Sequence, residues 1–267
     1  MGPKFVHFYL FYYICNGFGL KNEQIMRKLV IIPTYNEIAN ISAMIDKVFS
    51  LAGGFDLLVI DDGSPDGTAA VVKERQPEFE GRLFILERSG KLGLGTAYLA
   101  GFRWALEHGY DYVFEMDCDF SHNPDDLERL CEAAVGGADV VVGSRYVSGV
   151  NVVNWPMSRL LMSYFASKYV KIVTGMPVHD ATAGFVCYSR RALETIDLDA
   201  IRMKGYGFQI EMKYTAWRLR LPVKEVSIIF TERQLGASKM SGGIFGEAFF
   251  GVLKLPFRKI RPRKTAE

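Results

Sequence analysis

The sequence has few cysteines and no paired ones. Its 4 cysteines form no CxxC motif and are too sparse for a disulfide scaffold, so we interpret them as buried or incidental thiols in a reducing compartment. The formal net charge is only +2, too small to indicate nucleic acid as a partner. Low-complexity linkers and internal repeats are also lacking. With 49% hydrophobic and 23% charged residues, the chain is typical of an ordinary globular protein.

A long hydrophobic run is missing as well. The aromatic stretch 5–20 is shorter than the roughly 20 residues that span a bilayer. Only Lys4 precedes its apolar run and no small-residue cleavage site follows, which argues against a signal peptide. Met26 directly precedes the first clear strand pattern. We therefore expect residues 1–26 to be an extension outside the folded domain, disordered or non-native, with an interfacial anchor as the alternative.

From residue 27 onward, short apolar segments alternate with helical patterns. Residues 37–51, for example, carry Ile41, Ile45 and Val48 at helical spacing. This alternation predicts an α/β fold, a mostly parallel sheet flanked by helices on both faces. We expect strands at residues 28–33, 56–60, 82–86, 112–116, 139–142, 185–188 and 223–230, and helices near 37–51, 95–107, 124–134, 158–173 and 208–220.

Polar residues follow four of these strands directly. In such sheets ligands bind outside the carboxyl ends of the strands, so these residues are expected to lie on one rim and to form a binding site. They are Pro33-Thr34-Tyr35-Asn36-Glu37, Asp61-Asp62-Gly63-Ser64, Asp117-Cys118-Asp119 and Gly143-Ser144-Arg145.

Asp117 and Asp119 form the most informative motif. Two carboxylates this close, at the end of an apolar strand, repel each other unless a cation or a hydrogen-bond donor neutralises them. Mg²⁺ or Mn²⁺ bridging two phosphates would do so, because hard oxygen ligands suit these ions. The alternative is that Asp119 or Ser121 caps the helix that begins at Pro124. The position of this motif beside the three other polar segments at strand ends favours the metal.

The other motifs each have a functional interpretation and a purely structural alternative. Asp62 could accept hydrogen bonds from a nucleotide base or ribose, or it could introduce the turn at Gly63. Gly93-Leu94-Gly95 suggests a dinucleotide loop, but the first strand-to-helix turn has no GxGxxG, which argues against a dehydrogenase. Arg233 and Lys239 surround a Gly-Ala-Ser hinge after the last strand. They could close over a pyrophosphate, or they could belong to a solvated basic loop.

Taken together, these motifs resemble those of one family. The chain is similar to the family 2, GT-A fold glycosyltransferases and, within them, to the polyprenyl-phosphate (dolichol-phosphate) mannosyltransferases. The Ser-Pro-Asp-Gly-Thr extension at 64–68 and the segment from Arg233 to Ser238-Lys239 are specific to this branch, whereas the DxD motif is not. The matching segments, within about residues 28–242, are 32–37, 61–68, 93–97, 116–122, 143–146, 180–185, 204–211 and 233–239.

The resemblance implies a GT-A catalytic domain at residues 27–240 and an enzyme that moves mannose from GDP-mannose to a polyprenyl phosphate, using Mg²⁺ or Mn²⁺. Its catalytic residues would be Asp117, Asp119 and Arg145. Metal ligation would fall on Asp119, with Asp117, and on position 121. The family commonly has Gln there, so the shorter Ser121 leaves open whether a water takes its place. Implied donor contacts are Pro33, Tyr35, Glu37, Ile60, Asp62, Asp117, Cys118, Asp119, Arg145, Arg233 and Lys239.

A lipid-phosphate acceptor does not require a general base in the enzyme. A phosphate monoester has its second pKa near ~6, so it is already a nucleophilic dianion at neutral pH and needs no general base. A single displacement would then invert the anomeric centre and give a β-linked product. Two alternatives stay open: a UDP-glucose or other hexose donor, and an inert relative that binds nucleotide or acts as a scaffold. No protein partner is indicated.

The C-terminal residues 241–267 combine an apolar helical face with basic residues. A helix of about 15 residues is too short to span a bilayer, so we expect it to lie in the interface, peripheral on the cytoplasmic face of a membrane. The alternative is a last helix packed on the domain with a solvated tail. The apolar face is Ile244, Phe245, Ala248, Phe249, Val252 and Leu253, and the basic residues are Arg258, Lys259, Arg261, Arg263 and Lys264.

Overall fold

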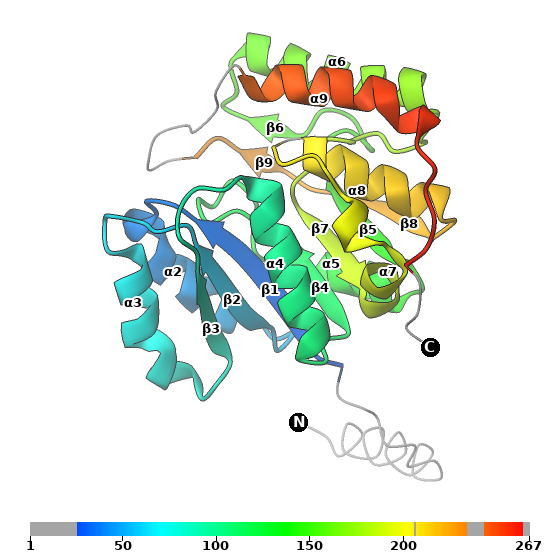
Figure 1. Cartoon of the computed structure of the whole chain (residues 1–267). Helices are drawn as coiled ribbons and strands as arrows, with labels where there is room; N and C mark the ends of the chain where they lie inside the picture. Colours follow the sequence, from blue (N-terminus) through cyan, green and yellow to red (C-terminus); the bar gives the residue numbers. More distant parts are fainter. Residues whose placement is uncertain (1–25, 206, 234–242, 264–267) are drawn as a thin grey trace, which may run out of the picture.

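A seven-stranded sheet forms the centre of the molecule (Figure 1). The computed structural model describes residues 26–205, 207–233 and 243–263. The strand order is β3-β2-β1-β4-β7-β5-β8, and neighbours are parallel except where β7 pairs with β4 and β5. The predicted mostly parallel sheet is thus confirmed, with one reversed strand inside it. The strands are β1 (Lys28–Thr34), β2 (Asp56–Asp61), β3 (Leu83–Glu87), β4 (Tyr112–Glu115), β5 (Val140–Ser144), β7 (Val186–Ser189) and β8 (Val223–Ser227).

Helices cover both faces of the sheet because the apolar side chains of its strands point alternately to either side. In β1, Leu29 and Ile31 join the core on one face, and Val30 and Ile32 join the core on the other. The first face packs against α4 (Leu94–Glu107), α7 (Arg190–Thr195) and α8 (Gly207–Arg218). The second packs against α2 (Ile38–Phe49), α3 (Thr68–Arg75) and α5 (Asp126–Val135). Short 3₁₀ segments are η1 (Gln76–Phe79), η2 (Leu198–Ala200) and η3 (Leu255–Phe257).

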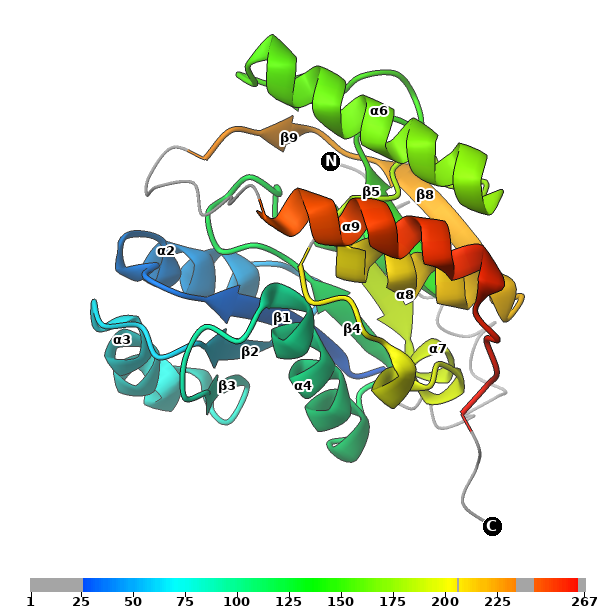
Figure 2. The ribbon, with the colours of Figure 1, turned by 45° about the horizontal axis from the view of Figure 1, so that its top comes forward.

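Two further helices, α6 (Met157–Thr174) and α9 (Gly243–Lys254), run side by side beyond the sheet (Figure 2). Val252 of α9 and Leu255 after it are buried with Val170 of α6 and Met203. The Tyr169 and Phe249 rings stack with centroids 4.9 Å apart. The C-terminal helix is therefore an integral part of the fold, held by its buried side chains. Among the described helices, none has the length and apolar character required to cross a membrane.

The predicted strand at 223–230 divides into two. After β8 the chain leaves the main sheet: Ile228 is buried, and β9 (Phe230–Thr231) pairs with β6 (Val152–Val153) in a separate two-stranded sheet. A continuous apolar run cannot reveal such a change of partner. Gly143 and Ser144 also lie inside β5 and do not follow it.

Candidate active site

A cavity of about 670 Å³ lies where the carboxyl ends of β4 and β5 meet α6 and α9. Its walls differ in character from one part to another. Asp117, Asp119 and Arg233 line a polar part, whereas Phe165 of α6 and Phe249 of α9 line an apolar part. Of the rim predicted from the sequence, the segments that follow β4 and end β5 therefore line one wall of this cavity, whereas residues 33–37 and 61–64 do not line it; two helices supply the opposite wall.

Asp119 is a buried carboxylate whose negative charge is compensated by neighbouring groups in the fold. Its Oδ1 accepts hydrogen bonds from the Ser121 hydroxyl at 2.6 Å and the Ser121 backbone N–H at 3.1 Å. Its Oδ2 lies 2.9 Å from a guanidinium nitrogen of Arg233. Burial raises the pKa of Asp119, but the Ser121 hydrogen bonds and the Arg233 charge outweigh burial, so the pKa lies below its ordinary value. Asp119 is therefore ionised at neutral pH.

Asp117 extends further into the open part of the site. Its side chain is 41% exposed, and its backbone N–H donates to Nδ1 of His122 at 3.3 Å. The His122 ring is buried and stacks on Phe185 with centroids 5.0 Å apart. Burial lowers the pKa of His122 to about 4, so the imidazole is neutral at physiological pH. His122 therefore orients the loop that carries the two aspartates.

The oxygen atoms here fit a divalent cation. Within the described ranges, no group of three His, Cys, Asp or Glu side chains converges on one point, so protein side chains alone do not form a complete metal cage. Asp117 and Asp119 nevertheless offer hard carboxylate oxygens, and the Arg233 guanidinium shows that a positive charge beside Asp119 is accommodated. Such a donor set suits Mg²⁺ or Mn²⁺ completed by phosphate oxygens. The Ser121 hydroxyl is directed at Asp119, which makes it a support for that carboxylate.

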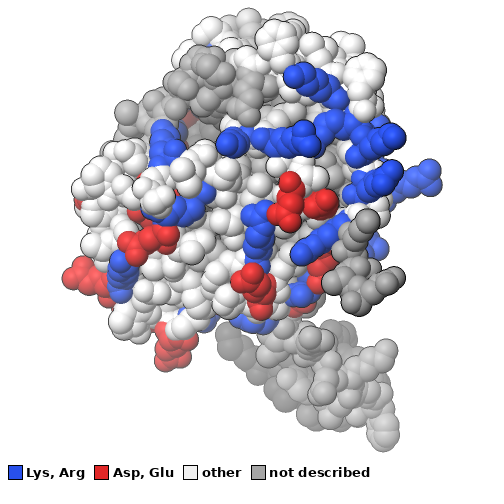
Figure 3. All heavy atoms as spheres, in the orientation of Figure 1, with Lys and Arg blue, Asp and Glu red and all other residues white. Residues whose placement is uncertain are grey.

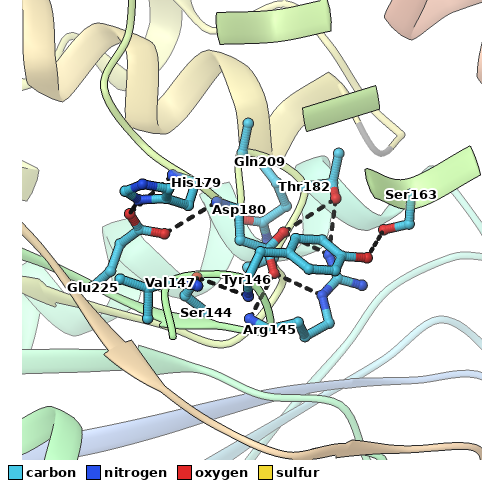
Figure 4. Close-up of polar contacts among 12 residues, drawn as sticks. Ser144, Arg145, Tyr146, Val147, Ser163, His179, Asp180, Thr182, Gln209 and Glu225 are labelled. Carbon is cyan, nitrogen blue, oxygen red and sulfur yellow. Dashed lines mark hydrogen bonds and ion pairs between the residues drawn. The ribbon is translucent and has the colours of Figure 1, made fainter. Parts of the chain in front are cut away.

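Arg145 lies directly after β5 and is held by a buried carboxylate (Figure 4). Its backbone N–H and Nε both donate to Oδ2 of Asp180, at 2.9 and 2.7 Å, and its Nη2 donates to Oδ1 at 2.6 Å. A further bond runs from Nη2 to the Thr182 hydroxyl at 2.9 Å. Burial raises the pKa of Asp180, but the Arg145 charge outweighs it and holds the pKa below its usual range. The guanidinium orientation is thus fixed.

Two residues of this wall were not among the sequence candidates. The Arg159 guanidinium lies over the Trp155 ring, 4.3 Å from its centroid, and the Arg145 guanidinium lies 5.4 Å from the same centroid. Arg159 is also paired with Glu232. Trp155 therefore lies between two cations in the cavity wall. Arg159 carries no local signal in the sequence, since it is one of three basic residues on a long helix and belongs to no motif.

The ends of β1 and β2 are tied together by polar contacts. Asp61 is buried and accepts hydrogen bonds from Thr34 at 2.9 Å and from the Ser64 hydroxyl at 2.6 Å. Both oxygens of Asp62 accept from Arg88, at 2.7 and 2.8 Å, and Arg88 also donates to Thr96 at 2.8 Å. Arg88 was not among the residues singled out from the sequence. The Asp62 carboxylate is therefore oriented by Arg88.

The remaining sequence candidates do not line this cavity. Pro33 and Ile60 sit near the ends of β1 and β2, and Tyr35 has the Lys91 ammonium 5.3 Å from its ring centroid. Glu37 and Cys118 are buried. The structure thus brings these strand ends to one edge of the sheet. Lys239, predicted as a second cation of the loop, lies outside the described residues.

One known protein family and several known proteins match this sequence. A family model described as "Glycosyl transferase family 2" matches residues 29–197, more than half of the chain. A "Polyprenol monophosphomannose synthase" of Mycolicibacterium smegmatis is 47% identical over 232 residues, 87% of this chain and 88% of the relative. An "Undecaprenyl-phosphate mannosyltransferase" of Micrococcus luteus is 49% identical over 229 residues, covering 86% and 93%.

Solved structures agree on the fold. Glucosyl-3-phosphoglycerate synthase of Mycobacterium tuberculosis in complex with phosphoglyceric acid superposes with a TM-score of 0.65 at 18% identity, covering 87% of this chain and 80% of that one. The same enzyme in complex with Mn²⁺, UDP-glucose and phosphoglyceric acid gives 0.61 at 18% identity, covering 87% and 79%. At this identity the likeness concerns the fold alone, and it confirms the predicted GT-A architecture.

Proposed function

The chain belongs to glycosyl transferase family 2, and from this premise we propose that it transfers mannose from GDP-mannose to the phosphate of a polyprenyl lipid, with inversion at the anomeric carbon. As a member of that family it is an enzyme, which argues against the inert alternative. The single observation that supports a lipid phosphate as the acceptor is the composition of the cavity. Charged groups line one part and apolar side chains of α6 and α9 line the other, as an amphiphile with a phosphate head and an isoprenoid tail requires.

The donor diphosphate belongs at Asp117 and Asp119. These carboxylates would hold Mg²⁺ or Mn²⁺, which when bound supplies positive charge to the departing nucleoside diphosphate. Arg233, paired with Asp119, adds a second positive charge at the same place. The mannosyltransferase names of the relatives support the sugar, and Asp62, oriented by Arg88, is available to the nucleoside.

The acceptor phosphate belongs between these carboxylates and the apolar helices. Arg145 and Arg159 line the cavity there, and their charges suit a phosphate dianion. Such a dianion attacks the anomeric carbon directly, so no side chain has to remove a proton. The neutral, buried His122 is consistent with a site that needs no general base. The chain's own work is to hold the two substrates in line and to stabilise the leaving group.

A panel of radiolabelled donors tests this assignment. Full-length protein with polyprenyl phosphate and Mn²⁺ is given GDP-mannose, UDP-glucose or another hexose donor, and label in the extracted lipid is counted. We expect GDP-mannose to exceed the others by about tenfold or more, and the product to be the β-anomer by NMR. Preferred transfer from UDP-glucose would overturn the donor, and the absence of any lipid product would overturn the acceptor.

An exposed apolar surface on α6 and α9 fits a peripheral membrane protein on the cytoplasmic face. Figure 3 shows uncharged side chains over the two helices, with Lys and Arg gathered beside them near the end of α9. Apolar surface of this extent on a globular protein usually marks an interaction site. Its members include Met157, Leu161, Phe165 and Ile172 of α6, Phe249, Phe250 and Leu253 of α9, and Phe257.

We expect Leu253→Asp combined with Phe257→Asp to reduce binding to lipid vesicles by about tenfold or more, because each inserted side chain contributes roughly 1.5–3 kcal/mol. These side chains are 41% and 88% exposed, so the fold tolerates the change. Donor binding and transfer to a short, water-soluble lipid phosphate should persist. Val135→Asp, at a 48% exposed site that ends α5, is the control. Unchanged flotation of the double variant with vesicles would contradict this surface.

The basic residues after α9 do not act alike, and this corrects one sequence expectation. Arg258 pairs with Glu211, a carboxylate that is almost fully buried, and also donates to the Ala200 carbonyl at 2.6 Å. It therefore anchors the C-terminal segment and does not face lipid.

Lys259→Glu with Arg261→Glu should weaken binding to anionic vesicles by about 1 kcal/mol per removed cation, without loss of stability. Arg258→Glu should instead lower the melting temperature. A stable Arg258→Glu protein would contradict the anchor.

A further inference from the structure

Lys213 is a fully buried cation that the proposed reaction does not use. It lies in the middle of α8, and its side chain has no solvent exposure. Burial lowers its pKa to about 8, so it is still mostly protonated at neutral pH. Burying an ammonium group is costly, and an apolar side chain of similar volume is often no less stabilising. A lysine at this place therefore calls for an explanation other than packing.

The ammonium group joins two segments that are distant in sequence. Nζ donates to the carbonyl oxygens of Ala183 at 2.6 Å and Ala181 at 3.2 Å. It also contacts the Gln209 carbonyl oxygen at 3.2 Å and the Gln209 side-chain oxygen at 3.3 Å. All four acceptors are neutral oxygens, so these contacts solvate the charge without a carboxylate among them.

The segment held by Lys213 is the one that orients Arg145. Asp180 precedes Ala181, and Thr182 lies between the two carbonyl acceptors. The Asp180 carboxylate and the Thr182 hydroxyl together receive the Arg145 guanidinium, as Figure 4 shows. The position of Arg145 therefore depends on a turn whose backbone is fixed from behind by Lys213.

The other branch of the contact leads to the aspartate loop. Gln209 lines the cavity, and its Nε2 donates to Oε2 of Glu115 at 2.7 Å. Glu115 ends β4 and immediately precedes the segment that carries Asp117 and Asp119. Gln209 therefore accepts from Lys213 and donates to Glu115, which places one continuous set of hydrogen bonds behind both the aspartates and Arg145.

We propose that Lys213 is a positioning residue that sets Arg145, through the 180–183 turn, against the Asp117 and Asp119 loop, and so places the acceptor phosphate in line with the donor. This inference rests on the proposed function, because it takes Arg145 to bind the acceptor phosphate. Charged neighbours of Lys213 are Glu115 on β4, Asp180 at the turn, Arg145 after β5 and Glu225 on β8. A shift of about 1 Å in a substrate-holding group can cost about a hundredfold in rate, so Lys213 would act by keeping Arg145 in a fixed position.

The test compares full-length wild type with Lys213→Met, which keeps the length of the side chain and removes the charge. Lys213→Gln, which keeps a donor on a shorter arm, is the second variant in case the first fails to fold. Lys224→Met on the adjacent β8, where the side chain is exposed, is the matched control. Three quantities are measured: KM and kcat for a short-chain polyprenyl phosphate, the affinity for GDP with Mn²⁺ by calorimetry, and the melting temperature.

We expect Lys213→Met to raise the acceptor KM or lower kcat/KM by about 10-fold to 100-fold, with nucleotide affinity and melting temperature close to wild type and with partial recovery in Lys213→Gln. An unchanged kcat/KM for the acceptor would overturn the proposal, and so would a fall in kcat that only follows a lower melting temperature. Added to Arg145→Lys, Lys213→Met should cost little more, whereas full multiplicative losses would overturn the route through Arg145. Absence of lipid product in wild type would overturn both the proposed function and this inference, while normal transfer by Lys213→Met would overturn only the latter.

Discussion

Asp119→Ala is expected to lower transfer by about a thousandfold or more and to abolish the divalent-ion dependence of nucleotide binding. The reason is that its carboxylate is the one charged group of the loop that is both buried and held in place, by two bonds from Ser121 and by Arg233. Removal of this carboxylate takes away the proposed anchor of the cation and the group that Arg233 contacts at 2.9 Å. Calorimetric titration of GDP with and without Mn²⁺, together with transfer rates, measures both effects.

The control for this substitution is Asp125→Ala. Asp125 lies at the start of α5, is 57% exposed and pairs with Lys47 at the surface. Its loss should leave transfer within about twofold of wild type, because exposed ion pairs contribute little. EDTA should inactivate wild type and the control alike. Near-normal transfer by Asp119→Ala, or wild-type activity that resists EDTA, would contradict the metal assignment.

Much of the site could be predicted from the sequence because parallel strands impose a simple geometry. Where an apolar run ends in a polar cluster, the cluster must lie at the carboxyl edge, and several runs ending in this way share that edge. Asp62, Asp117, Asp119 and Arg145 were found by this reasoning, and the structure places them at the ends of β2, β4 and β5. Here backbone direction alone determines where side chains meet.

The partners of these residues could not be predicted, since they are pairings between distant segments. Arg145 depends on Asp180, Asp62 on Arg88 and Glu211 on Arg258, and no local pattern links either member of a pair to the other. The reversed direction of β7 is hidden for a related reason, because a short buried strand has the same apolar composition whichever way it runs. Sequence patterns report burial, whereas these features are matters of orientation.

Asp180→Asn is expected to be the most destabilising substitution in the site. The carboxylate has no solvent exposure and receives three hydrogen bonds from Arg145, so the neutral amide would leave a largely buried guanidinium without its counter-charge. Breaking one partner of a buried pair costs about 3–5 kcal/mol, a large share of the roughly 5–15 kcal/mol that stabilise a typical domain. Urea unfolding at neutral pH measures the loss. Asp199→Asn, which removes the carboxylate of a surface pair with Arg103, is the control and should cost less than about 1 kcal/mol.

The pH dependence of this difference separates lost charge from lost shape. Because the pKa of Asp180 is lowered in the folded protein, its ionisation stabilises the fold above the unfolded-state pKa of about 3.9, and that contribution disappears as the pH falls toward the folded-state value. Asparagine has no such contribution at any pH. The gap in unfolding free energy between wild type and Asp180→Asn should therefore be constant from about pH 7 to pH 5 and narrow below about pH 4. A gap that stays equally wide in acid would mean that Asp180 acts through its shape, and that the charge of Arg145 is balanced by other groups.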